Sequence, residues 1–178
     1  MPSLSTSPKT TDSSERGPAP AQKITPFLWF DDKAEEAINF YTSLFDNSRI
    51  LSIARYGATG PGPEGTVMTA SFQLAGQEFV ALNGGPHFKF TEAVSFVINC
   101  ESQEEVDRYW EQLTADGGQE SQCGWLKDKY GLSWQIVPTI VSELMQDPDK
   151  EKSNRVMQEI LKMKKIEIPK LLEAADQK

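Results

Sequence analysis

Residues 24–44 of the chain read ITPFLWFDDKAEEAINFYTSL, and residues 93–113 read AVSFVINCESQEEVDRYWEQL. The two stretches align without a gap at a constant offset of 69 positions, so that Phe27 matches Phe96 and Leu44 matches Leu113. Each copy consists of an apolar run, an acidic segment and an amphipathic pattern with helical spacing. The chain therefore contains a duplicated strand–helix unit, and we expect two similar halves that enclose a site.

Strand signals follow each predicted helix. Apolar and alternating runs bounded by turn residues predict further strands at 49–56, 66–74, 78–82, 120–126 and 132–137. The expected order is βαβββ, then βαββ with a short additional strand, so the fold class is α+β. A ferredoxin-like dimeric barrel is the alternative, and it has fewer strands for each helix.

The helix ends and the domain limits follow from the flanking residues. We expect Asp31 or Asp32 to cap the first helix and Ser102, with Glu105 three residues later, to open the second. After Pro138 the pattern predicts short helices, one of them capped by Asp147. The predicted parts are a disordered tail rich in Ser, Thr and Pro at residues 1–22, a domain at 23–139 with modules at about 23–85 and 93–139, and a helical extension at 140–178.

Composition excludes several classes of partner. The net charge is −8 and the isoelectric point is about 4.8, so the surface would repel the phosphates of nucleic acid. No run of apolar residues approaches the length of a membrane span. The two cysteines, Cys100 and Cys123, are too few for a disulfide scaffold and are interpreted as reduced thiols. These features predict a cytoplasmic protein that binds neither nucleic acid nor membrane.

Four stretches of the chain form a recognisable set: ITPFLWFDDKAEEAINFYTSLF at 24–45, ALNGGPHFKFTEAVSFVINC at 81–100, GWLKDKYGLSWQIVP at 124–138 and RVMQEILKMKKIEI at 155–168. Together they resemble the vicinal-oxygen-chelate superfamily of glyoxalase I, extradiol dioxygenases and bleomycin-resistance proteins, and within it the PhnB-like branch. The resemblance implies paired βαβββ modules that form an incomplete barrel around a ligand cavity. It also implies a homodimer.

The same resemblance locates the positions where metal-dependent members carry His and Glu ligands. The matching positions are near Thr25 or Pro26, between Val80 and Asn83, near Val94 or Ser95, and at Gln135. None of these residues is His, Asp or Glu, and neutral amides are weak ligands for such ions. We therefore expect no bound metal and no cofactor.

The candidate ligand contacts lie where predicted strands end at the cavity. His87 is the only histidine, and it is either a general base or ligand contact or a loop residue without a role. Alternation along the last strand puts Trp134 and Gln135 on opposite faces, so Trp134 is core if Gln135 faces the cavity. The predicted ligand-binding residues are Trp29, Asn83, His87, Phe88, Trp125 and Gln135.

Two functions compete at this point. The first is a metal-free protein that binds a small apolar or aromatic compound, and the second is a lyase, isomerase or dioxygenase of the glyoxalase type. A vacant metal position favours binding, or acid–base chemistry through His87. The sequence Gly60–Gly65 fits G-x-G-x-x-G, but its prolines lack backbone N–H groups and a strand follows it, so it predicts a hairpin loop and no phosphate site.

Overall fold

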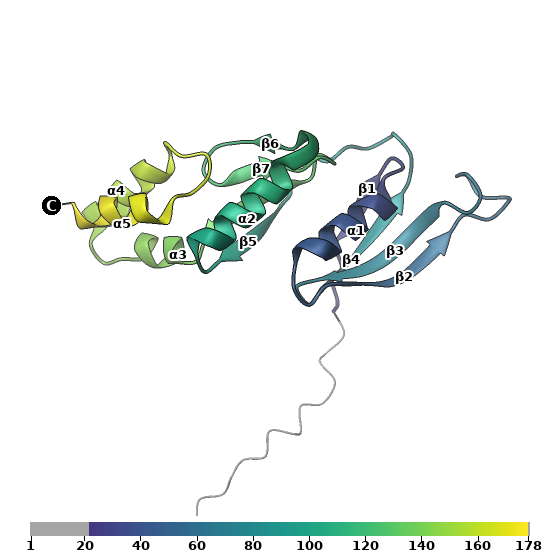
Figure 1. Ribbon diagram of the computed structural model, residues 1–178, viewed down its shortest axis with the longest axis horizontal. Helices are drawn as coiled ribbons and strands as arrows, with labels where there is room; N and C mark the ends of the chain where they lie inside the picture. Colours follow the sequence, from purple (N-terminus) through teal and green to yellow (C-terminus); the bar gives the residue numbers. More distant parts are fainter. Residues whose placement is uncertain (1–21, 178) are drawn as a thin grey trace, which may run out of the picture.

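The first module is a four-stranded sheet with one helix (Figure 1). In the computed structural model, which describes residues 22–177, its elements are β1 (Phe27–Phe30), α1 (Ala34–Leu44), β2 (Arg49–Arg55), β3 (Val67–Leu74) and β4 (Gln77–Asn83). The strand order is β1-β4-β3-β2, with β1 parallel to β4 and the other pairs antiparallel. The predicted disordered tail at 1–22 lies almost entirely outside the described residues.

The second module repeats this arrangement. Its elements are β5 (Ser95–Cys100), α2 (Gln103–Thr114), the 3-10 turn η1 (Ala115–Gly117), β6 (Gln119–Glu120), β7 (Trp125–Lys127) and β8 (Ser133–Pro138). The strand order is β5-β8-β7-β6, with β5 parallel to β8. Shifting α1 by 69 positions places it within α2, so the predicted duplication of a βαβββ module is confirmed. The alternative ferredoxin-like barrel does not fit, because each helix comes with four strands.

Two local predictions for the modules were wrong. Neither Asp31 nor Asp32 caps α1; the helix begins after Lys33, and the side chain of Asn83 accepts a hydrogen bond from the Ala34 N–H at 2.8 Å. A strand residue distant in sequence therefore replaces the local cap. The predicted strand 120–126 is two strands, because positive φ angles at Cys123 (58°) and Gly124 (83°) turn the chain between them.

One apolar core joins the two modules. Each helix covers one face of its own sheet (Figure 1), and aromatic contacts such as Phe79 with Phe96, at 5.3 Å between ring centroids, cross the junction. The other face of each sheet is open: Phe27 is 58% and Val97 is 49% exposed. The two sheets do not close into a barrel within one chain.

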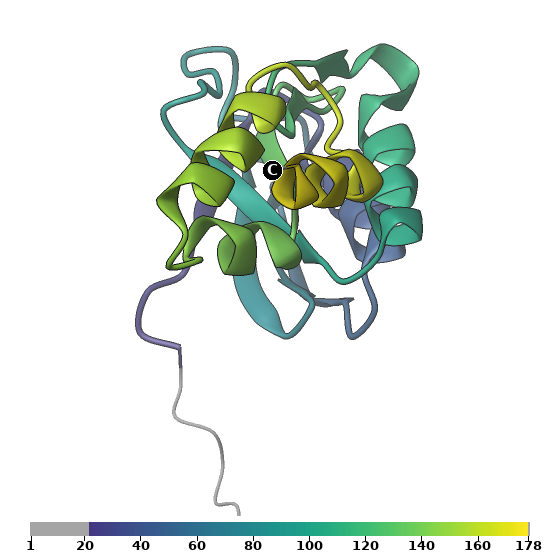
Figure 2. The ribbon, with the colours of Figure 1, turned by 90° about the vertical axis from the view of Figure 1, so that its left-hand side faces the viewer.

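The helical extension packs against the end of the second module (Figure 2). It contains α3 (Ile140–Met145), α4 (Lys150–Ile160) and α5 (Ile168–Asp176), which enclose a second, smaller core. The cap of α4 is Asp149 and not the predicted Asp147, since the Asp149 carboxylate accepts bonds from the N–H groups of Glu151 and Lys152. Within residues 22–177, every helix is too short or too polar to cross a bilayer.

Candidate functional site

A cavity of about 460 Å³ lies at the junction of the two modules. The end of β1, the linker between the modules and the turn after β7 all contribute to its wall. Five of its lining side chains are aromatic: Trp29, Phe30, Phe88, Phe90 and Tyr130. A concave surface rich in aromatic rings is the usual setting for a small planar ligand.

A hydrogen bond, a glycine and a contact between the two rings hold Trp29 and Phe88 in the wall of this cavity. The Trp29 indole N–H donates a hydrogen bond to the Gly85 carbonyl at 2.8 Å, which fixes the ring against the linker. A Cβ atom at Gly84 would overlap the same ring, so glycine is required for this close approach. Phe88 meets Trp29 edge to face, with 5.0 Å between centroids, and remains 65% exposed.

Phe30 forms the floor of the cavity from the side of the core. Its ring is buried and packs edge to face against Phe90 at 5.3 Å and Tyr130 at 6.1 Å. The Tyr130 hydroxyl donates a 2.9 Å hydrogen bond to Glu36. Burial and this bond to Glu36 both raise the pKa of Tyr130, which therefore stays a neutral donor.

Asn83 and His87 line a second cavity, of about 570 Å³, on the other side of the 84–87 segment. The Asn83 side chain is occupied within the fold, because it bonds Ala34 as described and donates to the Val67 carbonyl at 3.0 Å. The Tyr56 hydroxyl donates to the Asn83 carbonyl at 2.7 Å. His87 is exposed at the rim, so this cavity offers an imidazole that a ligand could reach.

Trp125 and Gln135 lie apart from both cavities, on the open face of the second sheet. They are register partners on β7 and β8, and neither lines the two cavities above. The Gln135 amide donates to the Ser95 hydroxyl on the neighbouring strand at 2.9 Å. Trp134 is 3% exposed in the core, which confirms the predicted alternation. The six predicted contacts thus form three pairs: Trp29 with Phe88, Asn83 with His87, and Trp125 with Gln135.

The residues at the family's metal positions do not form a strong metal site. Gln135 and Ser95, which correspond to ligands from the last strand and the fifth strand, bond each other through an amide and a hydroxyl. Such neutral donors are poor ligands for a divalent transition metal. Across residues 22–177, no three His, Cys, Asp or Glu side chains gather in a group that could hold a metal ion.

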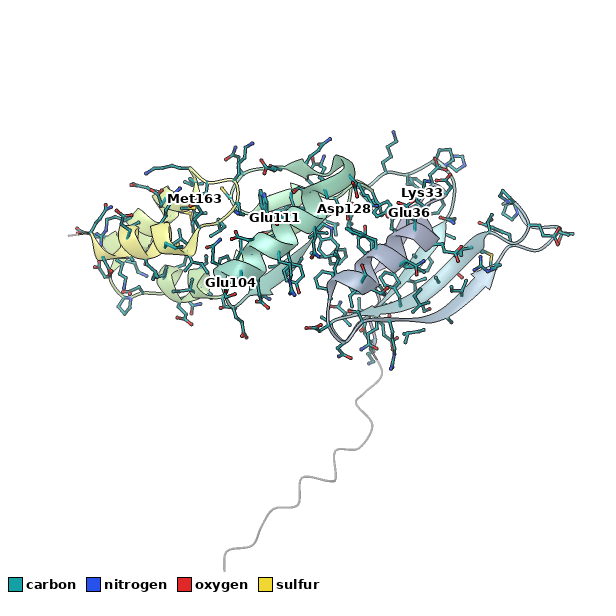
Figure 3. All side chains as sticks on the ribbon, viewed as in Figure 1. Lys33, Glu36, Glu104, Glu111, Asp128 and Met163 are labelled. Carbon is teal, nitrogen blue, oxygen red and sulfur yellow. The ribbon has the colours of Figure 1, made fainter. Side chains whose placement is uncertain are left out.

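No pattern in the sequence indicated a buried carboxylate near the junction cavity. Asp128, in the turn after β7, is 2% exposed and accepts bonds from Tyr41 (2.7 Å), the Trp134 indole (2.8 Å) and the backbone N–H groups of Tyr130 and Leu132. Figure 3 shows Asp128 between the modules. Burial raises its pKa, and the bonds from Trp134 and Tyr41 offset part of that rise. Asp128 fixes the turn that carries Tyr130.

Comparison with known proteins agrees with this architecture. A sequence model of the family described as 3-demethylubiquinone-9 3-methyltransferase matches residues 22–137. A solved PhnB protein from Bacillus cereus is 48% identical, with a TM-score of 0.62, over 66% of this chain and 100% of its own. No curated protein matches the chain.

Two more distant structures show the fold alone. PA1353 from Pseudomonas aeruginosa is 19% identical with a TM-score of 0.55, and the match covers 66% of this chain and 98% of that protein. The fosfomycin resistance protein FosX from Listeria monocytogenes is 15% identical with a TM-score of 0.53, over 72% of this chain and 100% of its own. All three matched proteins are thus covered almost completely, whereas about a third of the present chain lies outside each match.

Proposed function

Because the chain belongs to the family described as 3-demethylubiquinone-9 3-methyltransferase, in its PhnB-like branch with the glyoxalase fold, we propose that it binds a small aromatic compound in the junction cavity. The observation that carries this proposal is the set of five aromatic side chains around about 460 Å³ of space. Phe88 supports it further, since a ring that is 65% exposed beside Trp29 offers an unoccupied face. The proposed binding uses no metal.

We do not propose methyl transfer, the reaction in the family's description, for this chain. A binding site for the nucleoside part of a methyl donor is usually built on a glycine-rich turn between a strand and a helix. The chain's G-x-G-x-x-G sequence, Gly60–Gly65, lies instead in the hairpin between β2 and β3.

A binding assay with two phenylalanine variants tests the proposal. Phe88→Ala should weaken the binding of N-phenyl-1-naphthylamine, a neutral aromatic probe, by about tenfold, because one ring of the wall is lost. Phe27→Ala is the matched control, since Phe27 is also exposed, at 58%, but does not line the cavity. Fluorescence titration measures both affinities. Loss of binding only in Phe27→Ala would place the ligand on the open sheet faces and contradict the proposal.

Turnover of the glyoxalase type is the second candidate function. It is favoured by one observation, the exposed imidazole of His87 at the rim of the second cavity, where Asp31, Asp32 and Tyr56 also contribute to the wall. Substrate turnover that is abolished in His87→Gln and retained in Phe88→Ala would favour this candidate. Elemental analysis of the purified protein tests the metal-free state in parallel.

We also propose that the protein is a cytoplasmic homodimer. The open sheet faces carry exposed apolar side chains, including Phe27 and Val97, which a second copy would cover. Both cysteines are free, as suits a reducing compartment. Light scattering should give twice the 19.9 kDa of one chain, and a monomer at micromolar concentration would contradict the dimer.

A further inference from the structure

The wall of the junction cavity is also rich in lysine. Four lining residues are Lys33, Lys89, Lys127 and Lys129, from the start of α1, the linker, the end of β7 and the turn after it. Asp31 is the one acidic residue in the same wall. This concentration of cations is unexpected in a chain with a net charge of −8.

Neighbouring carboxylates neutralise only part of this charge. Glu36 is shared between Lys33 (3.6 Å) and Lys129 (3.3 Å), and Glu92 pairs with Lys127. Figure 3 shows Lys33 and Glu36 together at the start of α1. Among the side chains that line the cavity, four lysines accompany one carboxylate, Asp31, so the wall itself has a surplus of positive charge.

Lys89 carries this surplus. It is exposed, it lines the cavity, and among residues 22–177 it makes no ion pair. Its neighbours on either side are Phe88 and Phe90, so the ammonium group is attached to the same linker that supplies two of the aromatic rings. A ligand held between those rings would thus lie beside a cation whose charge is not already neutralised.

The geometry points to an aromatic anion as the ligand of this cavity: a planar ring system bearing a carboxylate, sulfonate or phosphate that Lys89 and Lys33 bind. This inference rests on the proposed function and specifies the chemical class of its ligand. The rings supply the apolar contact and the ammonium groups supply charge-assisted hydrogen bonds to the anionic group. A lysine acts as a point charge, so all three acids are suitable.

A pair of fluorescent probes that differ mainly in charge tests the inference. 8-Anilino-1-naphthalenesulfonate carries a sulfonate on the same ring skeleton as the neutral N-phenyl-1-naphthylamine. We expect the sulfonate probe to bind more tightly at low salt, and its affinity to fall as salt shortens the Debye length from about 10 Å at 0.1 M to about 3 Å at 1 M. The affinity of the neutral probe should not fall over the same range.

Three variants test whether Lys89 and Lys33 supply the positive charge that binds the sulfonate. Lys89→Gln should weaken binding of the sulfonate probe about threefold to fivefold, and Lys33→Gln with Lys89→Gln about tenfold or more, with little change for the neutral probe. Lys162→Gln is the control: it removes one charge from an exposed side chain of the extension, far from the cavity in sequence. Displacement of the bound sulfonate probe by 1-naphthoate, but not by 1-naphthalenemethanol, would extend the result to carboxylates.

The outcomes separate this inference from the proposed function. If the neutral probe binds in a manner that depends on Phe88, and the lysine variants bind the sulfonate probe as Lys162→Gln does, the aromatic site stands and the anion inference is overturned. If neither probe binds the folded protein, both proposals fail. Near-ultraviolet circular dichroism of each variant establishes that the fold is retained, because the sulfonate probe also binds partly unfolded chains.

Discussion

Asp128 shows how much a single residue contributes where two modules meet. Its carboxylate is buried and accepts four hydrogen bonds, of which one comes from Tyr41 in the first module. Such a group is stable in the interior only while its donors are present, since an unpaired buried charge is costly. Tyr41 and Trp134 depend on Asp128 in turn, because its carboxylate accepts the hydrogen bonds from the Tyr41 hydroxyl and the Trp134 indole N–H.

Asp128→Asn should lower the free energy of unfolding by about 2–3 kcal/mol, because the amide places N–H groups against donors that it cannot satisfy. Urea denaturation followed by tryptophan fluorescence measures the change. Asp46→Asn, at an exposed position, is the control and should stay within about 0.5 kcal/mol of the parent protein. Equal effects of the two substitutions would show that the network contributes nothing to stability.

The cysteines give a chemical test of burial at the residue scale. Burial raises the pKa of the Cys100 thiol to about 12, whereas Cys123 is partly exposed at the turn between β6 and β7. The reactive species is the thiolate, so iodoacetamide at pH 8 should label only Cys123 in the folded protein. Mass spectrometry identifies the labelled site, and urea should expose Cys100. Labelling of Cys100 in the folded state would contradict its placement in the core.

Residue patterns predicted some of these environments and not others. The alternation that separates Trp134 from Gln135 is local, and the structure confirms it. The partner of Asp128 in the first module is 87 positions away in sequence, and no local pattern carries that information. The lysines in the wall of the junction cavity were not predicted for the same reason: Lys89 and Lys129 come from separate loops, and only the packing of the modules brings them to one wall.

At the scale of elements, α2 is held at both of its faces. One face packs on the second sheet, and the polar side of its first two turns contacts the extension. Gln103 donates to the Ile166 carbonyl at 3.2 Å and accepts from the Ile168 N–H at 2.7 Å. Asp107 lies one turn later and pairs with Lys165 at 2.6 Å. The helix therefore links the βαβββ module to the C-terminal helices.

The Asp107–Lys165 pair should make this link dependent on pH. The hydrogen bond with Lys165, followed by that with Gln103, lowers the pKa of Asp107 in the folded state. A lowered pKa means that the carboxylate stabilises the fold above the ordinary Asp value of about 4, and that this stabilisation is lost as the pH falls through the folded value. Because the Asp107 side chain is 41% exposed, the pair contributes about 0.5 kcal/mol at most.

Asp107→Asn should accordingly be slightly less stable than the parent chain at pH 7, and the difference should be smaller at pH 3, below the ordinary Asp value. Urea denaturation at both pH values measures it. Glu111→Gln, on the exposed side of the same helix, is the control for loss of one negative charge. A difference that persists unchanged at pH 3 would assign the effect to something other than the ion pair.

The presence of each helix and strand was easier to predict than the residues at which it begins and ends. The strand and helix of each copy follow from periodicity in the sequence, and both copies fold as expected at an offset of 69 positions. The caps were less predictable because a distant residue can supply them, as Asn83 does for α1. Asp147 and Asp149 both suit a cap by composition, and only the bonds to Glu151 and Lys152 distinguish them.

The whole molecule divides into a paired-module core and an extension with its own apolar cluster. The Bacillus cereus relative is covered completely by a match that spans only 66% of this chain, so a protein of this family can fold without the extension. In the present chain the two parts are joined by hydrogen bonds such as that from the Cys123 N–H to the Met163 carbonyl at 2.8 Å.

A chain that ends at Thr139 should therefore fold, with a lower melting temperature, since removal of the extension uncovers Cys123 and the apolar surface beneath it. It should still bind the neutral probe, because no residue of the extension lines the junction cavity. Thermal unfolding and fluorescence titration measure these two properties. A truncated chain that is unfolded at 25 °C would show that the extension belongs to the folding unit.

The shared carboxylate of Asp128 also bears on the history of the chain. Two halves that repeat at a fixed offset indicate that one strand–helix module was duplicated and fused. Now the second half buries a charge that Tyr41 of the first half helps to satisfy. Separation of the two halves would leave this buried carboxylate without the Tyr41 hydroxyl, so the second half depends on the first for one of its buried hydrogen bonds.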